Sequence, residues 1–306
     1  ELANYLFMKT ISTFKEYQEL HARSVANPEK FWEEIAESFT WKKKWEQVLD
    51  WNFEEPNVKW FEGGQLNITE NCLDRHLEKY SDKTAIIWEP NNPSEAAINI
   101  TYKELHQKVC KFANVLKNNG IAKGDRICLY MPMVPELAIA VLACARIGAI
   151  HSVVFAGFSF KSVADRIQDA SCKMVITADG AYRGAKQIPL KPVIDQALET
   201  CSSVKKVIVL KRTGADITMQ TDRDVWWANE LEKASDSFEA ESMDSEDELF
   251  ILYTSGSTGK PKGVVHTTAG YLLGAHISFK YMFGIRPEDK YWCTADVGWI
   301  TGHTYI

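Results

Sequence analysis

The apolar positions between residues 101 and 120 repeat at the spacing of one helix face. Thr101 and Glu104 have the spacing of a capping box, and Gly120 suits a C-terminal cap. The apolar residues between them are Leu105, Val109, Phe112 and Leu116. This pattern predicts one amphipathic helix that presents its apolar face to a core.

Short apolar runs and helical stretches then alternate as far as residue 210. Strands are expected at Ile127–Tyr130, His151–Phe155, Met174–Thr177 and Val207–Leu210. Helices are expected from Pro135 to a cap at Gly148, from about Ser159 to Ala170, and around Val193–Thr200. Strand and helix in repeated alternation predict an α/β fold, a parallel doubly wound sheet with flanking helices.

The regions before and after this alternation of strands and helices differ from it in composition. Residues 1–80 are rich in tryptophan, and we expect them to form an N-terminal extension packed on a main body of residues 81–306. Residues 213–247 turn acidic and lose periodicity, apart from Trp226-Trp227, which open a possible short helix, and this predicts a surface excursion. Leu249–Tyr253 then reads as a buried strand because its apolar run is continuous.

Composition narrows the range of partners and compartments. The chain has 306 residues, of which 45% are hydrophobic, so it can bury a sizeable core. Its net charge of -6 argues against nucleic-acid and anionic-membrane surfaces, which need clustered Lys and Arg. The seven cysteines are an odd number without metal or redox spacing. With no signal-peptide pattern and no apolar run near 20 residues, the expectation is a cytoplasmic protein with reduced thiols.

The densest chemical signal lies directly after the predicted strand at 249–253. Residues 254–263, TSGSTGKPKG, combine glycines, hydroxyls and two lysines. Glycines let backbone N–H groups approach a polyphosphate, and lysines supply charge without fixed geometry. A P-loop NTPase motif is excluded, because only two residues separate Gly256 from Gly259 and a proline follows Lys260. A flexible solvent-exposed loop is the structural alternative.

The segment YTSGSTGKPKGVVHT resembles the phosphate loop of the adenylate-forming superfamily, and residues 51–77, 126–159 and 291–305 are similar to acetyl-CoA synthetases in particular. The resemblance implies an acid–thiol ligase that converts a carboxylate and ATP into acyl-AMP and pyrophosphate, after which coenzyme A displaces AMP. It implies ATP and coenzyme A as substrates, acetate as the acid, and Mg²⁺ held by phosphates and later carboxylates. The implied ATP contacts are Thr254, Ser255, Gly256, Ser257, Thr258, Gly259 and Lys260, with Lys262 nearby.

The same resemblance assigns the remaining site residues. The implied coenzyme A contacts are Phe155, Gly157, Arg183, Gly184, Ala185, Lys186 and Thr301. Trp299, Ile300 and Thr301 are expected to line the acyl pocket. Relatives carry Arg where this chain has Lys186, and Lys keeps the charge but loses the bidentate fork. His303 is assigned no chemical role, and the catalytic lysine, the acid-pocket tryptophan and the small C-terminal domain are expected beyond Ile306.

Two alternatives remain open on the sequence. A propionyl-CoA or other short-chain acyl-CoA synthetase would show nearly the same loop and coenzyme A contacts. A non-catalytic fragment that binds nucleotide or coenzyme A belongs to a different class. The residues after Ile306 would separate these alternatives, because they would carry the acid pocket and the late catalytic lysine.

Overall fold

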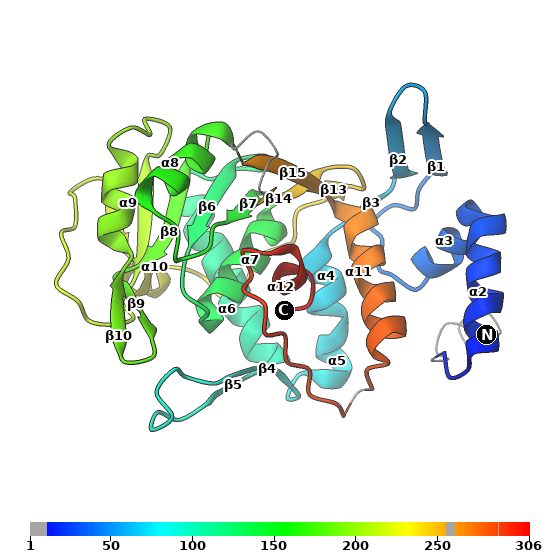
Figure 1. Ribbon diagram of the computed structural model, residues 1–306, viewed down its shortest axis with the longest axis horizontal. Coiled ribbons are helices and arrows are strands. Elements are labelled where there is room, and N and C mark those ends of the chain that lie inside the picture. The colour runs from blue at the N-terminus through cyan, green and yellow to red at the C-terminus, as the bar shows by residue number, and fades with distance from the viewer. Residues whose placement is uncertain (1–10, 255–260, 287) are drawn as a thin grey trace.

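A seven-stranded sheet forms the centre of the computed structural model, which describes residues 11–254, 261–286 and 288–306 (Figure 1). The strand order is β12-β11-β8-β6-β7-β14-β15. The bounds are β6 Arg126–Tyr130, β7 Ile150–Val153, β8 Met174–Ala178, β11 Lys206–Leu210, β12 Asp224–Trp226, β14 Glu248–Thr254 and β15 Lys262–Thr267. Every neighbouring pair is parallel except β14 and β15. The predicted α/β sheet is therefore confirmed, with one antiparallel edge.

The antiparallel strand β15 is an addition to the predicted parallel sheet. Only residues 255–261 separate β14 from β15. A parallel crossover needs a dozen or more residues, whereas antiparallel neighbours need only a short connection. The chain after β14 is therefore too short to return to the far end of the sheet, and β15 runs back along its partner.

Helices cover both faces of the sheet (Figure 1). One face carries α6 (Tyr102–Asn118) and α7 (Pro135–Ile147), and the other carries α8 (Phe160–Asp169) and α9 (Lys191–Leu198). Local chemistry explains the bounds: Thr101 and Glu104 form the predicted capping box of α6, and Gly148 ends α7 at φ 71°. A hydrophobic core lies on each face of the sheet, and strand β6 contributes side chains to both. Ile127 and Leu129 point into one core, and Cys128 and Tyr130 point into the other.

The segment between β11 and β14 is more than the surface excursion predicted for it. It adds strand β12 to the sheet edge and contains α10 (Trp227–Glu232) and β13 (Met243–Asp244). Trp227 is buried and stacks on Phe112 with ring centroids 3.8 Å apart. The acidic composition of the segment did not predict this burial, because a single large aromatic side chain can anchor a segment whose other residues are charged.

The N-terminal region packs on the same core. Its elements are α2 Phe14–Ala26, α3 Pro28–Ala36, β1 Gln47–Asn52, β2 Asn57–Glu62, β3 Gln65–Leu66, α4 Ile68–Cys72, the 3-10 turn η1 Asp74–His76 and α5 Leu77–Tyr80. Four of its tryptophans pack against the main hydrophobic cluster: Trp32, Trp41, Trp45 and Trp60. Trp51 does not, because it lies nearer than Trp60 to the turn of the β1–β2 hairpin, which projects from the body, and it is 59% exposed (Figure 1).

Long-range contacts tie this region to residues 240–247. Strand β3 pairs with β13, the backbone N–H of Trp60 donates to Glu246 at 2.6 Å, and the Ser245 hydroxyl donates to the Phe61 carbonyl at 2.7 Å. The residues joined by these two hydrogen bonds are more than 180 positions apart along the chain. The extension is thus completed by a segment that follows most of the sheet in sequence.

A charged seam joins the extension to α7 and α6. Arg146 donates two hydrogen bonds to Asp74, at 2.8 and 2.9 Å, and His106 lies 3.3 Å from the same carboxylate. Burial alone would raise the pKa of Asp74, but the hydrogen bonds from His106 and Arg146 outweigh it and lower that pKa. The hydrogen bond to Asp74, with a second to Cys110, raises the pKa of His106 to about 9.

The remaining elements are two hairpins and two helices. Their bounds are β4 Thr84–Trp88, β5 Ile98–Thr101, β9 Gly180–Arg183, β10 Lys186–Pro189, α11 Thr268–Phe283 and α12 Ile300–Thr304. All seven cysteines are free and five are buried, as the sequence predicts. Within the described residues, no helix combines the length and the apolar character needed to cross a bilayer.

Candidate functional site

The sheet has a switch point between β6 and β7. After β6 the chain crosses by α7 to β7, and after β7 it returns by α8 to β8 on the far side of β6. Ligands of open α/β sheets bind outside the carboxyl ends of strands at such a point. The chain that leaves β7 here contains two of the sequence-predicted residues, Phe155 and Gly157.

Close packing fixes the turn after β7. The buried Tyr130 hydroxyl donates to the carbonyls of Ala156, at 3.2 Å, and Phe158, at 2.9 Å. Burial raises the pKa of Tyr130 to about 12, so the hydroxyl keeps its proton as a donor. A Cβ on Gly157 would overlap the Phe155 ring. Glycine is therefore required for Phe155 to fold back over its own turn.

A second predicted segment meets this turn. Trp299, the N-cap residue of α12, lies edge-on to Phe155 with centroids 5.0 Å apart and 6.4 Å from Phe158. We call Phe155, Phe158 and Trp299 the aromatic wall. Trp299 is 49% exposed and Ile300 is 44% exposed, so neither is plain core. The structure therefore brings together residues that lie more than 140 positions apart in the sequence.

The phosphate-loop strand ends beside this wall. Strand β14 is buried over 249–252 and neighbours β7, and it ends at the exposed Thr254. Lys262, also exposed, begins β15 directly opposite Thr254. The two ends of the predicted loop are thus held side by side at the carboxyl edge of β14. The other predicted residues of the loop lie outside the described residues: Ser255, Gly256, Ser257, Thr258, Gly259 and Lys260.

The predicted basic residues lie on a separate element. Arg183 and Lys186 face each other across the β9–β10 hairpin, with Gly184 at φ 58° and Ala185 in the two-residue turn. Asn91 clamps the turn, because its amide donates to the Gly184 carbonyl at 2.7 Å and its oxygen accepts from the Gly184 N–H at 3.1 Å. Figure 1 shows this hairpin apart from α12. The segment is therefore a hairpin with an Asn-clamped turn, where the sequence suggested only a basic cluster.

The base of the hairpin has one buried carboxylate as its anchor. Asp179 accepts backbone N–H bonds from Gly180 and from residues 212–215. Burial alone would raise the pKa of Asp179, but these N–H donors outweigh it and lower that pKa. The carboxylate thus stays charged and ties the β9 end to the chain after β11.

His303 has a buried environment that the sequence did not reveal. Its Nε2 lies 2.7 Å from Nε2 of His151 on β7, and its Nδ1 lies 2.7 Å from the Tyr271 hydroxyl on α11. Burial lowers the pKa of His151 to about 3 and also lowers the pKa of His303, so both rings are neutral. Both ring nitrogens of His303 therefore have hydrogen-bond partners, as expected of a buried histidine without a chemical role. No sequence motif marks His151 or Tyr271 as its partners.

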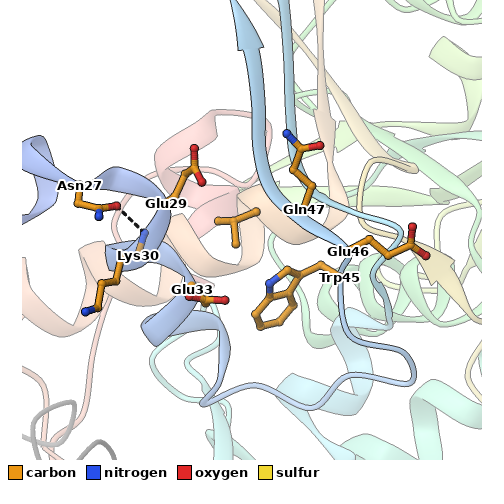
Figure 2. Close-up of a pocket in the computed structure, with 8 residues that line it drawn as sticks. Asn27, Glu29, Lys30, Glu33, Trp45, Glu46 and Gln47 are labelled. Carbon is orange, nitrogen blue, oxygen red and sulfur yellow. Dashed lines mark hydrogen bonds between the residues drawn. The ribbon is translucent and has the colours of Figure 1, made fainter.

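An open cleft of about 470 Å³ lies elsewhere, between α3 and the start of β1 (Figure 2). Its lining includes three carboxylates, Glu29, Glu33 and Glu46, with Lys30 as the one basic residue among those that line it. Such a surface repels a polyphosphate or a carboxylate substrate. The chemistry therefore favours the switch-point edge over this cleft as the functional site.

Comparisons with known proteins identify the family. Residues 73–306 match the family described as AMP-binding enzyme, and residues 17–72 match the family described as acetyl-coenzyme A synthetase N-terminus. The first match includes the turn after β7, the hairpin, the phosphate-loop segment and α12.

Individual relatives and a solved structure give the same result. An acetyl-coenzyme A synthetase of Gamma-proteobacterium EBAC31A08 is 59% identical over 97% of this chain and 46% of the relative. Acetyl-coenzyme A synthetase 2 of Pseudomonas aeruginosa is 56% identical over 95% of this chain and 45% of the relative. The structure of acetoacetyl-CoA synthetase from Streptomyces lividans superposes with a TM-score of 0.87 at 26% identity, over 94% of this chain and 44% of that one. The chain thus spans less than half the length of these relatives, and it belongs to the AMP-binding enzyme family.

Proposed function

We propose that the full-length protein that contains this chain is an AMP-forming acetate–CoA ligase. In the first half-reaction, acetate attacks the α-phosphate of ATP, giving acetyl-AMP and pyrophosphate. In the second, the coenzyme A thiol attacks the acetyl carbonyl, and AMP leaves. This chain corresponds to the N-terminal part of such an enzyme, because it matches an acetyl-coenzyme A synthetase N-terminus family and less than half of each relative.

One observation carries the proposal: two segments distant in sequence converge on neighbouring strand ends. Thr254 and Lys262 hold the ends of the phosphate loop at β14, and the aromatic wall stands at the end of β7. A reaction between ATP and a small acid needs a polyphosphate cradle next to a partly apolar pocket. The half-exposed Trp299 and Ile300 suit the apolar side of that pocket.

The hairpin suits the phosphates of coenzyme A. Arg183 and Lys186 are exposed and directly opposite each other, and like charges in that position destabilise a hairpin. Neither forms an ion pair with a described residue. A bound phosphate would offset this repulsion and accept hydrogen bonds from both side chains. In this proposal Phe155, Gly157 and Thr301 contact the pantetheine arm, and Gly184 and Ala185 bring the hairpin backbone to the phosphate.

Magnesium enters the proposal only with ATP. Among the described residues, no three His, Cys, Asp or Glu side chains lie together as a metal site. The residues present therefore do not form a complete Mg²⁺ site, and we assign no step of the reaction to them through the metal. We further propose that residues 1–80 form an extension on the adenylation domain and that the protein acts in the cytoplasm on small molecules, without nucleic acid or membrane.

The test is exchange of labelled pyrophosphate into ATP by the full-length protein. We expect acetate to support exchange more strongly than propionate or acetoacetate, because acetyl-coenzyme A synthetases match this chain at 53–59% identity. Strongest exchange with propionate would move the assignment to another short-chain acid. Absence of exchange with every short carboxylate would overturn the proposed activity and favour a non-catalytic binding role.

A further inference from the structure

A row of aromatic rings crosses three neighbouring strands beneath α12. His151 on β7 and His266 on β15 are both register partners of Phe250 on β14. The Phe250 ring stacks on His266 at 4.4 Å and lies 5.6 Å from the ring of His151. His303 of α12 stacks on Phe250 at 3.9 Å and on His151 at 5.0 Å. The ring of His303 is therefore the contact through which the short helix α12 packs on the sheet.

The hydrogen bonds at this contact have a preferred direction. Both histidines are neutral, so each ring has one N–H. The Tyr271 hydroxyl donates to Thr304 Oγ1 at 3.1 Å, which leaves its oxygen to accept from His303 Nδ1–H. His303 Nε2 must then accept from His151 Nε2–H at 2.7 Å.

This arrangement also explains the one buried ring nitrogen without a partner. Among the described residues, His151 Nδ1 has no hydrogen-bond partner. In the direction given above it is an acceptor, and in the opposite direction it would be a buried N–H donor. Buried N–H donors without a partner are rarer than buried acceptors without one. The hydrogen bonds therefore run from His151 to His303 and from His303 to Tyr271, each residue donating to the next.

Helix α12 needs such an anchor because it is too short to hold its own position. It spans Ile300–Thr304, and isolated helices of this length do not form in water. The backbone N–H of His303 donates to the Trp299 carbonyl at 2.9 Å, so the anchored residue is bonded directly to the N-cap. At the N-cap, Trp299 is half-exposed and touches the aromatic wall. Movement at His303 would thus move Trp299.

We propose that His151 and His303 are positioning residues: their buried hydrogen bond holds α12 against the sheet and thereby places Trp299 and its neighbours for the acyl substrate. The inference rests on the proposed function only for the nature of that substrate. Neither histidine is exposed to a reacting group, since they are 1% and 7% exposed. They act through the helix rather than on the acid.

The test uses full-length protein with His303→Phe, His151→Phe, the double variant and His303→Gln. Phenylalanine keeps a stacking ring and removes the hydrogen bond, whereas glutamine keeps one donor and one acceptor. His266→Phe is the matched control, because His266 stacks on the same Phe250 and the described residues show no hydrogen bond from it to α12.

We expect His303→Phe and His151→Phe each to lower kcat/KM for acetate on the order of ten- to hundredfold, with KM for ATP unchanged, because misplacement of a positioning group by about 1 Å has effects of this size. The double variant should lose little more than either single one, and His303→Gln should fall between wild type and His303→Phe. Equal loss in the acetate and ATP parameters, or a control as damaging as His303→Phe, would overturn the positioning role.

Hydrogen exchange gives a second readout that needs no activity. In the single variants, amides of residues 296–305 should exchange faster, while those of β6 and β7 should keep wild-type protection. Unchanged exchange at 296–305 would refute the anchor even if the enzyme proves to be an acetate ligase. Faster exchange there, in a protein that shows no acid-dependent activity, would refute the proposed function and leave the anchor standing.

Discussion

The two proposed binding regions, the aromatic wall and the β9–β10 hairpin, depend on different kinds of interaction. The turn that carries Phe155 and Phe158 is packed: the Tyr130 hydroxyl donates to two of its carbonyls, and a Cβ on Gly157 would overlap the Phe155 ring. The hairpin presents Arg183 and Lys186 in solvent, where the Asn91 clamp holds the backbone turn and leaves the cationic side chains exposed. One region is defined by shape and the other by charge.

The difference shows how each region should respond to change. Packed groups are intolerant of small changes in volume, because their neighbours have no space to relax. Exposed charges are screened by salt and tolerate displacement, because Coulomb attraction varies slowly with distance. We therefore expect substitutions near the wall to affect chemistry and substitutions in the hairpin to affect affinity for coenzyme A.

The largest effect is expected at Thr254, the exposed residue at which β14 ends. Thr254→Val keeps the volume of the side chain and removes its hydroxyl at the end of β14. If that hydroxyl stabilises the departing pyrophosphate, acetate-dependent exchange should fall about 10²–10³-fold, as for loss of one preorganised donor. Thr267→Val, at the other end of β15, is the control and should leave kcat unchanged. A loss of less than threefold at Thr254, on the scale of one hydrogen bond, would remove it from the site.

The next largest effect should follow Gly157→Ala. The added methyl group would overlap the Phe155 ring, which must move, and overpacking of this kind costs about 1–3 kcal/mol. Thioester formation should fall roughly ten- to hundredfold. Gly274→Ala on α11 is the matched control, because no atom lies within 4 Å of the added Cβ. Wild-type rates in Gly157→Ala would show that the wall is not shape-limited.

A smaller and more selective effect is expected in the hairpin. Arg183→Ala should raise KM for coenzyme A about tenfold, the lower end of the range for a hydrogen bond to a charged group, and leave ATP–pyrophosphate exchange intact. The KM of the wild type should also rise with salt, and Lys186→Arg should lower it by restoring a bidentate fork. If exchange fell as much as thioester formation, the hairpin would be serving the fold rather than coenzyme A.

The smallest expected effect concerns the seam at Asp74, which lies in neither region. The pKa of His106 is raised to about 9 in the folded protein, so the folded state retains its proton where the unfolded state loses it. This contribution is full below about pH 6.5 and is lost as pH rises to about 9. We expect a fall of about 1 kcal/mol in the free energy of unfolding, reduced by partial exposure. Urea unfolding of wild type and His106→Gln at pH 6 and pH 9 measures it; a variant with the same pH dependence would contradict the assignment.

Local patterns predicted the helices well and long-range geometry poorly. The capping box at Thr101, Pro135 and the αL Gly148 act within a few residues, and they located α6 and α7 to within two residues. The direction of β15 depended instead on the length of the connection after Thr254. The short helix at Trp227 was predicted, but the burial of its side chain against Phe112 was not, because the two residues are more than 100 positions apart.

The site shows the same division. The phosphate-loop segment was predicted from its motif, and the residues at 155–157 and 299–301 were predicted from the family resemblance of contiguous segments. The hydrogen bonds that hold α12 against the sheet were not predicted. They join His151, Tyr271 and His303, which come from three elements and meet only in the folded protein. A histidine within an apolar strand, such as His151, was the one available signal, since a buried imidazole requires a partner.

The pairing of the N-terminal extension with residues 240–247 also has a consequence for synthesis. Trp60 and Phe61 leave the ribosome long before Ser245 and Glu246, their hydrogen-bond partners. At about 5–20 residues per second, roughly 10 to 40 seconds separate the two events. During that interval the tryptophans of the extension lack part of their packing surface and remain exposed to chaperones, proteases and other nascent chains.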